Sequence, residues 1–309
     1  MRRWGDEDKI NKQNTMRIRI VSPSAAIDPH YIDGAKAVLE SWGHTVSIGK
    51  YAKGAHGGSA GTQEERLEDL NNAFADPETD AILCSRGGYG LAQIIDRVQL
   101  PAEKQKLLIG FSDITCLHNL LGQTDTPSLH AIMAKHIARL PEGAEALTAL
   151  RQTLEGAPIR YTVAPHPLNR TGKATGRLRG GNLSVMYGLQ GTPLQVNTRR
   201  DTILFIEDIG EPHHAIDRML QNLRLSGILP QLQGLIVGQF TDCQDDPRFL
   251  CTIQESVRQA VEPYGFPVVF GFPAGHVDLN LPMMMNAPCT IEVTEDCVRF
   301  EQEGIRTKE

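Results

Sequence analysis

The alternation of short apolar segments with amphipathic ones across the first half of the chain is the feature that most constrains its fold. This pattern predicts strands at 17–21, 45–48, 80–85 and 107–111, and helices at 29–42, at 64–74 and from about residue 113. Short apolar strands separated by amphipathic helices are typical of a parallel sheet that helices cover on both faces. We therefore expect an α/β domain over residues 16–155.

The second half has a different pattern, in which strands follow one another more closely. Strands are expected at 202–206, 234–240, 267–271, 289–294 and 297–301, and helices at 214–226 and 252–261. The last two strands should form a hairpin around Glu295-Asp296. Residues 156–176 carry three prolines and three glycines with little periodicity, which predicts a linker. We expect a smaller α+β or β-rich domain over 177–309, and a disordered extension over the polar residues 1–15.

Composition and charge exclude several classes of protein. The formal net charge is −6 and no Lys/Arg-rich run occurs, which argues against nucleic acid as the main partner. No segment approaches the roughly 18 apolar residues of a membrane span, and the N-terminus lacks the apolar core of a secretory signal. We therefore expect a cytoplasmic protein. The six cysteines form no C-x-x-C pair, so we expect free thiols and no metal site.

Ser112 lies where an apolar strand gives way to a helix, in Gly110-Phe111-Ser112-Asp113-Ile114. This position would expose its hydroxyl beside free N–H groups and the positive end of the helix dipole, which can stabilise an oxyanion. The alternative is that Ser112 is only an N-cap. The sequence does not match the G-x-S-x-G elbow of the α/β-hydrolases.

The glycine-rich segment 86–90 follows the preceding strand of the predicted sheet. Loops at the carboxyl ends of parallel strands tend to share one crevice, and glycines let the backbone approach a ligand closely. The N–H groups of Gly88 and Asp113 could then form an oxyanion hole. The alternative is a tight turn that needs positive φ angles.

A nucleophilic serine needs a base, and the base needs an orienting group. His276 follows an apolar strand in a loop shaped by Gly and Pro, and Glu207 is the first charged residue after the strand at 202–206. Strand alternation sends Glu207 and Asp208 to opposite sides, so only one of them can face the histidine. His213 and His214 are competing bases, but their place at a helix start predicts solvated rings. The acids could alternatively serve that helix by complementing its dipole.

Taken together and in order, these segments resemble the LD-carboxypeptidase family of serine peptidases, which also contains microcin-immunity peptidases. The matching segments are Gly61-Thr62 with Glu65-Arg66, Arg86-Gly87-Gly88-Tyr89-Gly90, Gly110-Phe111-Ser112-Asp113-Ile114-Thr115, Gly180-Gly181-Asn182-Leu183, Glu207-Asp208 with Ile216-Asp217-Arg218, and Gly275-His276. The resemblance implies a flavodoxin-like N-terminal domain that carries the nucleophile and a smaller C-terminal domain that carries the acid and the base.

The resemblance also implies a role for each matched residue. Ser112 would be the nucleophile, Glu207 the orienting acid and His276 the base. Gly88 and Asp113 would supply the oxyanion hole, with Gly87 as an alternative to Gly88.

The family's usual substrate is the cell-wall tetrapeptide, from which the enzyme releases terminal D-alanine without a metal or another cofactor. A murein-derived peptide as substrate and a homodimer are therefore expected. Microcin-type relatives instead cleave peptide-nucleotide conjugates, and a non-catalytic α/β binding module is the alternative from another class. Arg86 and Asn182 are candidates for substrate binding, and the cation for the substrate's carboxylate is expected among Arg86, Arg179 and Lys135.

Overall fold

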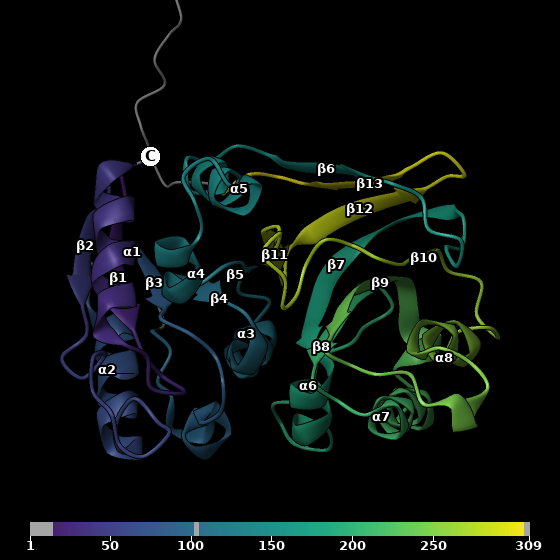
Figure 1. Cartoon of the computed structure of the whole chain (residues 1–309), viewed down its shortest axis with the longest axis horizontal. Coiled ribbons are helices and arrows are strands. Elements are labelled where there is room, and N and C mark those ends of the chain that lie inside the picture. Colours follow the sequence, from purple (N-terminus) through teal and green to yellow (C-terminus); the bar gives the residue numbers. More distant parts are fainter. Residues whose placement is uncertain (1–14, 102–104, 306–309) are drawn as a thin grey trace, which may run out of the picture.

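A mostly parallel sheet forms the centre of the first domain in the computed structural model, which describes residues 15–101 and 105–305 (Figure 1). Its strands are β1 (Arg17–Val21), β2 (Thr45–Ile48), β3 (Ala81–Cys84), β4 (Leu107–Gly110), β5 (Ser128–His130) and β11 (Met283–Met285). They lie in the order β11-β5-β4-β3-β1-β2, and only β11 is antiparallel to its neighbour. The five parallel strands have the flavodoxin-like order, which confirms the predicted α/β domain. Apart from Thr15, the predicted extension 1–15 lies outside the described residues.

Helices cover both faces of this sheet, as the alternating sequence pattern predicts. Helices α1 (Pro29–Ser41) and α4 (Ala134–Arg139) pack on the face that carries Ile18 and Ile20. Helices α2 (Gln63–Ala75) and α3 (Thr115–Gly122) pack on the opposite face, which carries Ile82 and Leu108. Thr62 caps α2 in a reciprocal pair with Glu65, which explains this part of the sequence motif.

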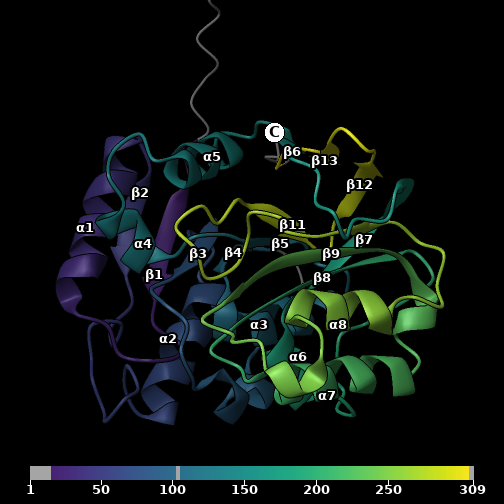
Figure 2. The same cartoon turned by 45° about the vertical axis from the view of Figure 1, so that its right-hand side comes forward.

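The second domain is built on a mixed sheet (Figure 2). Its strands are β6 (Ile159–Val163), β7 (Gly172–Asn182), β8 (Thr202–Ile209), β9 (Leu232–Thr241), β10 (Val268–Val269), β12 (Pro288–Val293) and β13 (Val298–Gln302). Strands β7 to β10 run parallel, while β12, β13 and β6 continue the sheet in antiparallel pairs. Helices α6 (Leu183–Leu189), α7 (His213–Leu225) and α8 (Ile253–Ala260) cover one face. The hairpin of β12 and β13 is confirmed.

Some elements differ from the sequence prediction. The segment 156–176, expected to be a linker, contains β6 and the first residues of β7, and both belong to the second sheet. Strand β6 is an edge strand whose burial alternates, so it has no continuous apolar run. The strand expected at 267–271 is limited to Val268–Val269. Helix α5 (Glu145–Leu154) ends next to residue 155, where the first domain was expected to end, and the exact domain boundary stays a proposal.

The face of the second sheet that its own helices leave uncovered packs against the first domain. Leu178, Ile203 and Phe205 of the second sheet share one apolar core with Leu129 and Met283 of the first. Strand β11 contributes to this contact because it belongs to the C-terminal half of the chain but pairs with β5. The two sheets are therefore held together by one buried hydrophobic core, and burial of its apolar surface stabilises both domains at once.

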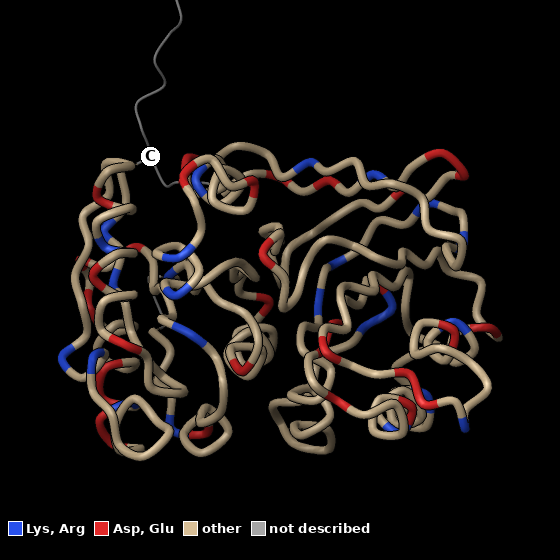
Figure 3. The backbone as a smooth tube through the Cα atoms, in the orientation of Figure 1, with Lys and Arg blue, Asp and Glu red and all other residues tan. Residues whose placement is uncertain are grey.

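Charged residues of both signs are interspersed over both domains (Figure 3). Within the described ranges, no helix is long and apolar enough to cross a bilayer. All six cysteines are free thiols, as predicted; Cys84, Cys116 and Cys289 are buried and the other three are partly exposed.

The ion pair between Arg179 and Asp125 joins the two domains, and we expect the loss of each partner to change stability by a different amount. The Arg179 side chain is 1% exposed, whereas Asp125 is 29% exposed and also pairs with Arg199. Asp125→Ala leaves a buried guanidinium without its carboxylate, so the loss of unfolding free energy should approach the roughly 3–5 kcal/mol known for broken buried pairs. Arg179→Met should cost less, because the remaining carboxylate reaches water and Arg199.

Urea unfolding of both variants measures this difference. The control is Arg199→Met, which removes an exposed ion pair and should change stability by about 1 kcal/mol or less. A larger loss for Arg179→Met than for Asp125→Ala would contradict the prediction.

Candidate active site

Ser112, His276 and Glu207 lie in one line of hydrogen bonds. Ser112 Oγ is 2.9 Å from His276 Nε2, and His276 Nδ1 is 2.7 Å from Glu207 Oε2. Because the carboxylate can only accept, Nδ1 carries the proton that it donates to Glu207. Nε2 of the neutral ring is therefore free to accept the Ser112 proton. The first domain supplies the serine and the second domain supplies the histidine and the glutamate.

Ser112 has a backbone conformation that few residues other than glycine adopt. Its φ angle is +67° where β4 ends and a short 3-10 helix, Ser112–Ile114, begins. Such strain of order 1–3 kcal/mol persists only where the surroundings enforce it, and it is frequent at active sites. The N-cap position of this 3-10 helix is Phe111, and Ser112 is its first residue, so the alternative of a simple N-cap is wrong. Its hydroxyl is directed at His276 instead.

Glu207 lies near the end of β8, at a point where the register with β9 shifts. Such irregularities redirect a side chain and are common beside active sites. Glu207 is fully buried and turns to His276, while Asp208 turns to the other side and accepts hydrogen bonds from Asn182 and Ser184. Burial raises the pKa of Asp208 to about 6. As strand alternation predicts, the two carboxylates point to opposite sides and only Glu207 faces the histidine.

His276 lies in the loop between β10 and β11, and the residue before it must be glycine. Gly275 has a φ angle of +123°, and a Cβ atom there would lie 2.9 Å from Glu207 Oε2. The imidazole packs edge-on against Phe111 at 4.9 Å between ring centres. Thr241 donates a hydrogen bond to the His276 carbonyl. These contacts hold the ring between its two partners.

The glycine-rich loop after β3 lies against Ser112. A Cβ atom on Gly87 would be 2.7 Å from Ser112 Cβ and 3.3 Å from the Asp113 nitrogen, so only glycine allows this approach. The Gly87 carbonyl accepts from the Ala25 amide, and in a trans peptide the following N–H, that of Gly88, points the opposite way. Within residues 15–101 and 105–305, neither Gly88 N–H nor Asp113 N–H donates to an acceptor. Both remain available for an oxyanion.

The Asp113 side chain organises the loops around Ser112, a role that the sequence analysis missed. Its carboxylate accepts from Ser24 Oγ at 2.7 Å and from the Leu91 amide at 3.0 Å, and burial raises its pKa. The buried Arg66 guanidinium, in turn, donates to the carbonyls of Pro23 and Gly90. The sequence does contain a signal for this contact, because Ser22-Pro23-Ser24 directly follows β1. The carboxyl ends of parallel strands lie at the same edge of a sheet, so this segment is expected near Ser112 and Asp113.

A second serine–histidine pair in the chain has the opposite polarity. His213 is buried, so its predicted solvation is wrong, and its Nε2 is 2.8 Å from Ser256 Oγ. Its Nδ1 accepts a hydrogen bond from the Asp246 amide, which forces the proton onto Nε2. His213 therefore donates to Ser256 and cannot take its proton, whereas His276 can accept from Ser112.

The candidates for substrate binding have different environments. Arg179 is buried in its ion pair with Asp125, which removes it as a cation for a substrate carboxylate. Asn182 is buried as the N-cap of α6 and donates to Asp208, so its side chain has no group directed at a substrate. Arg86 is partly exposed and donates to the Ala26 carbonyl. Lys135 is partly exposed, and its backbone amide donates to Ser85, next to Arg86.

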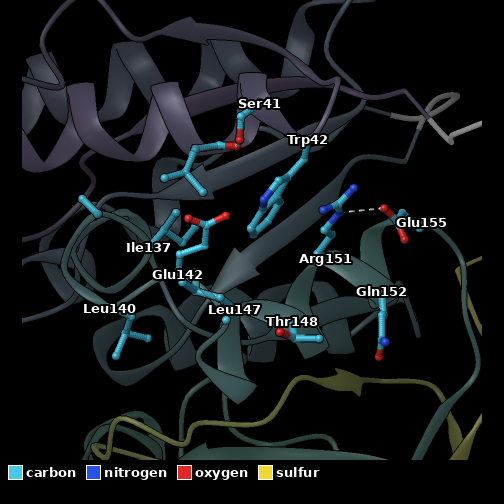
Figure 4. A pocket seen from close by; sticks show the side chains of 13 residues that line it. Ser41, Trp42, Ile137, Leu140, Glu142, Leu147, Thr148, Arg151, Gln152 and Glu155 are labelled. Atoms are coloured by element: carbon cyan, nitrogen blue, oxygen red, sulfur yellow. Dashed lines mark hydrogen bonds and ion pairs between the residues drawn. The ribbon is translucent and has the colours of Figure 1, made fainter.

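A cavity of about 770 Å³ lies between α1, α4 and α5, but none of the residues of the serine–histidine–glutamate line contributes to it (Figure 4). Trp42 and Ile137 are among its apolar walls, and Arg151 pairs with Glu155 at one side. No group of three His, Cys, Asp or Glu side chains in the described parts of the chain could hold a metal ion.

Comparison with known proteins supplies the family. A model of the LD-carboxypeptidase N-terminal domain matches residues 18–131, and a model of the LD-carboxypeptidase C-terminal domain matches residues 175–291. The probable murein peptide carboxypeptidase of Bacillus subtilis is 34% identical over 94% of this chain and 93% of its own length. The chain belongs to the LD-carboxypeptidase family.

Two further members of this comparison extend the similarity. The murein tetrapeptide carboxypeptidase of Pseudomonas aeruginosa is 31% identical over 84% of this chain and 88% of its own length. The crystal structure of muramoyltetrapeptide carboxypeptidase from Oxalobacter formigenes superposes with a TM-score of 0.84, at 24% identity, over 94% of this chain and all of the other. The LD-carboxypeptidase fold therefore spans both domains.

Gly87→Ala tests the close approach of the glycine-rich loop in this LD-carboxypeptidase family member. Gly87 has no positive φ angle, so alanine fits its backbone, but the new methyl group would collide with Ser112 Cβ and Oγ. We expect the reaction of Ser112 with a fluorophosphonate to slow by about a hundredfold or more, as displacements near 1 Å cause. Gly58→Ala is the control, because its methyl group meets nothing within 4 Å. Unchanged labelling of a folded Gly87→Ala protein would refute this geometry.

Proposed function

We propose that this chain is a metal-independent serine peptidase that removes terminal D-alanine from murein-derived tetrapeptides. The observation that carries the proposal is the continuous hydrogen bonding from Ser112 through His276 to Glu207. Its polarity suits proton transfer from the serine, and the neighbouring Gly88 and Asp113 amides suit an oxyanion. Membership of the LD-carboxypeptidase family supports the same reaction class.

In the proposed reaction, His276 Nε2 takes the Ser112 proton while Oγ attacks the carbonyl carbon before D-alanine. The Gly88 and Asp113 N–H groups donate to the oxyanion of the tetrahedral intermediate; Gly87 N–H is the alternative to Gly88. When the C–N bond breaks, His276 returns its proton to the amine of D-alanine, which leaves an ester on Ser112. Water then attacks the ester, passing one proton through His276 back to Ser112 and releasing the tripeptide. Glu207 keeps the ring oriented and stabilises its positive charge in both steps.

The choice of substrate rests on the relatives. Those in B. subtilis and P. aeruginosa are described as a probable murein peptide carboxypeptidase and a murein tetrapeptide carboxypeptidase. We extend this substrate class to the present chain and place the cut between an L-centre of the diamino acid and D-alanine. The homodimer and the cytoplasmic location remain predictions.

A carboxypeptidase must also recognise the free carboxylate next to the scissile bond, and a cation is the usual means. Since Arg179 and Arg66 are buried with partners of their own, we propose Arg86 or Lys135 for this role. Both belong to segments joined by the hydrogen bond from Lys135 N to Ser85 O.

Substitutions of the three central residues test the reaction class. Ser112→Ala and His276→Ala should each lower kcat by at least about a thousandfold, as loss of triad members does. Glu207→Gln should lower it by about a hundredfold or more, because the amide can offer Nδ1 a donor and so favour the wrong tautomer. Turnover should survive chelators and thiol reductants. Near-normal turnover by Ser112→Ala, or zinc-reversible inhibition by a chelator, would exclude the serine mechanism.

Four peptides test the substrate: the free and the C-terminally amidated forms of an LD tetrapeptide and of its all-L analogue. We expect D-alanine release from the free LD peptide, and a large loss on amidation because the cation is left unpaired. Arg86→Met and Lys135→Met complete the design, since the true carboxylate ligand should lower the rate on the free acid but not on the amide. Equal rates on LD and LL peptides would reject the carboxypeptidase assignment. Preference for a peptide-nucleotide conjugate would instead favour a microcin-type activity.

A further inference from the structure

Asn280 is fully buried between the loop of His276 and the edge of the first sheet. Its Oδ1 accepts from the Gly275 amide at 2.9 Å, and His130 Nε2 lies 3.0 Å from the same oxygen. Gly275 directly precedes His276, while His130 ends β5 in the domain of the nucleophile. The two side chains therefore connect the loop of the base in one domain to the sheet of the other.

The polarity of this connection is fixed. The Gly275 N–H can only donate, so Asn280 must present its oxygen, and His130 Nε2 must then carry a proton. Burial lowers the pKa of His130 to about 3, which keeps its ring neutral and leaves that proton as its only one. Both hydrogen bonds to Asn280 Oδ1 therefore have a fixed direction: the Gly275 N–H and His130 Nε2–H donate, and the amide oxygen accepts.

The His130 ring also touches the segments that carry the other two residues of the site. Its centre is 5.6 Å from that of Phe111, which precedes Ser112. It is 5.0 Å from that of Phe205, which lies two residues before Glu207, in an edge-on contact. Through Phe111, Phe205 and Asn280, one buried imidazole contacts the backbone segments of all three site residues.

We propose that His130 and Asn280 are positioning residues that set the His276 ring between Ser112 and Glu207. This inference rests on the proposed function, because it concerns how its proton transfer is aligned. Without the Nε2 donor, Asn280 loses the partner that fixes its amide, and the Gly275-His276 backbone loses its anchor to the first domain. The alignment of Nε2 with Ser112 Oγ then loosens, although no group that touches the substrate has changed.

The decisive comparison is His130→Leu with His130→Gln. Leucine removes the donor, whereas the amide nitrogen of glutamine can occupy the place of Nε2. We expect His130→Leu to lower kcat by about ten- to a hundredfold, in line with misplacements of up to 1 Å, with KM changed by less than about twofold. His130→Gln should recover most of the loss, and Asn280→Ala should reproduce the leucine result.

The matched control is the pair His213→Leu and His213→Gln. His213 is also buried and its Nε2 also bonds to a side-chain oxygen, but it lies at the start of α7, where its hydrogen-bond partners are Ser256 and the Asp246 amide. Thermal unfolding of all variants gives the stability loss. His213→Leu should lose stability comparably while keeping kcat, which separates positioning from a general weakening of the fold.

The rate of fluorophosphonate labelling of Ser112 is the second readout, since it requires no peptide recognition. It should fall in His130→Leu by the same factor as kcat. If wild-type Ser112 is not labelled, the proposed function fails. If it is labelled, and folded His130→Leu or, should that variant not fold, Asn280→Ala reacts as fast as wild type, the positioning role alone is overturned.

Discussion

The buried apolar contact between the two sheets is the constraint on which the rest of the structure depends. Ser112 belongs to one domain, and Glu207 and His276 belong to the other, so the hydrogen bond of 2.9 Å between Ser112 and His276 crosses the domain interface. Close-packed interiors resist displacement, because a small shift loses many dispersion contacts at once. The shared core of Phe205, Met283 and their neighbours therefore fixes the distance between segments that are remote in the sequence.

Several buried polar groups around this core have a hydrogen bond whose donor and acceptor are fixed by their chemistry. Glu207 can only accept from His276, the Gly275 amide can only donate to Asn280, and Asp113 accepts from Ser24 and Leu91. The contrast with His213 shows how little separates a histidine that can accept the proton of a serine from one that cannot. There, a single backbone N–H on Nδ1 reverses the direction of the hydrogen bond to serine.

Local pattern was sufficient to predict the elements that have an apolar run or an amphipathic period of their own. The strands of the first sheet up to β4, helices α1 and α2, the β12–β13 hairpin and the position of Ser112 just after β4 follow from periodicity and from strand–turn boundaries. Glu207 instead lies inside β8, which runs to Ile209, and His276 lies in the loop after β10 rather than at a strand end. Strands β5 and β11 were missed because each is only three residues long and is stabilised by its neighbours in space rather than by its own sequence.

The burial of His213, Asn182 and Arg179 was missed for a related reason, since the partners that allow a polar group to be buried lie far away in the chain. The same limit hides His130 and Asn280, which lie 150 positions apart in the sequence and give no sign there of their contact.

The antiparallel pairing of β11 with β5 has a consequence for how the protein is made. Residues 283–285 complete an edge of the sheet whose other strands all precede residue 131. During synthesis on a ribosome, that edge stays unpaired until nearly the whole second domain has been translated. The first domain therefore cannot complete its six-stranded sheet until β11 has been made. His276 belongs to the same late part of the chain, so the last strand of this sheet and the last residue of the Ser112–His276–Glu207 line become available together.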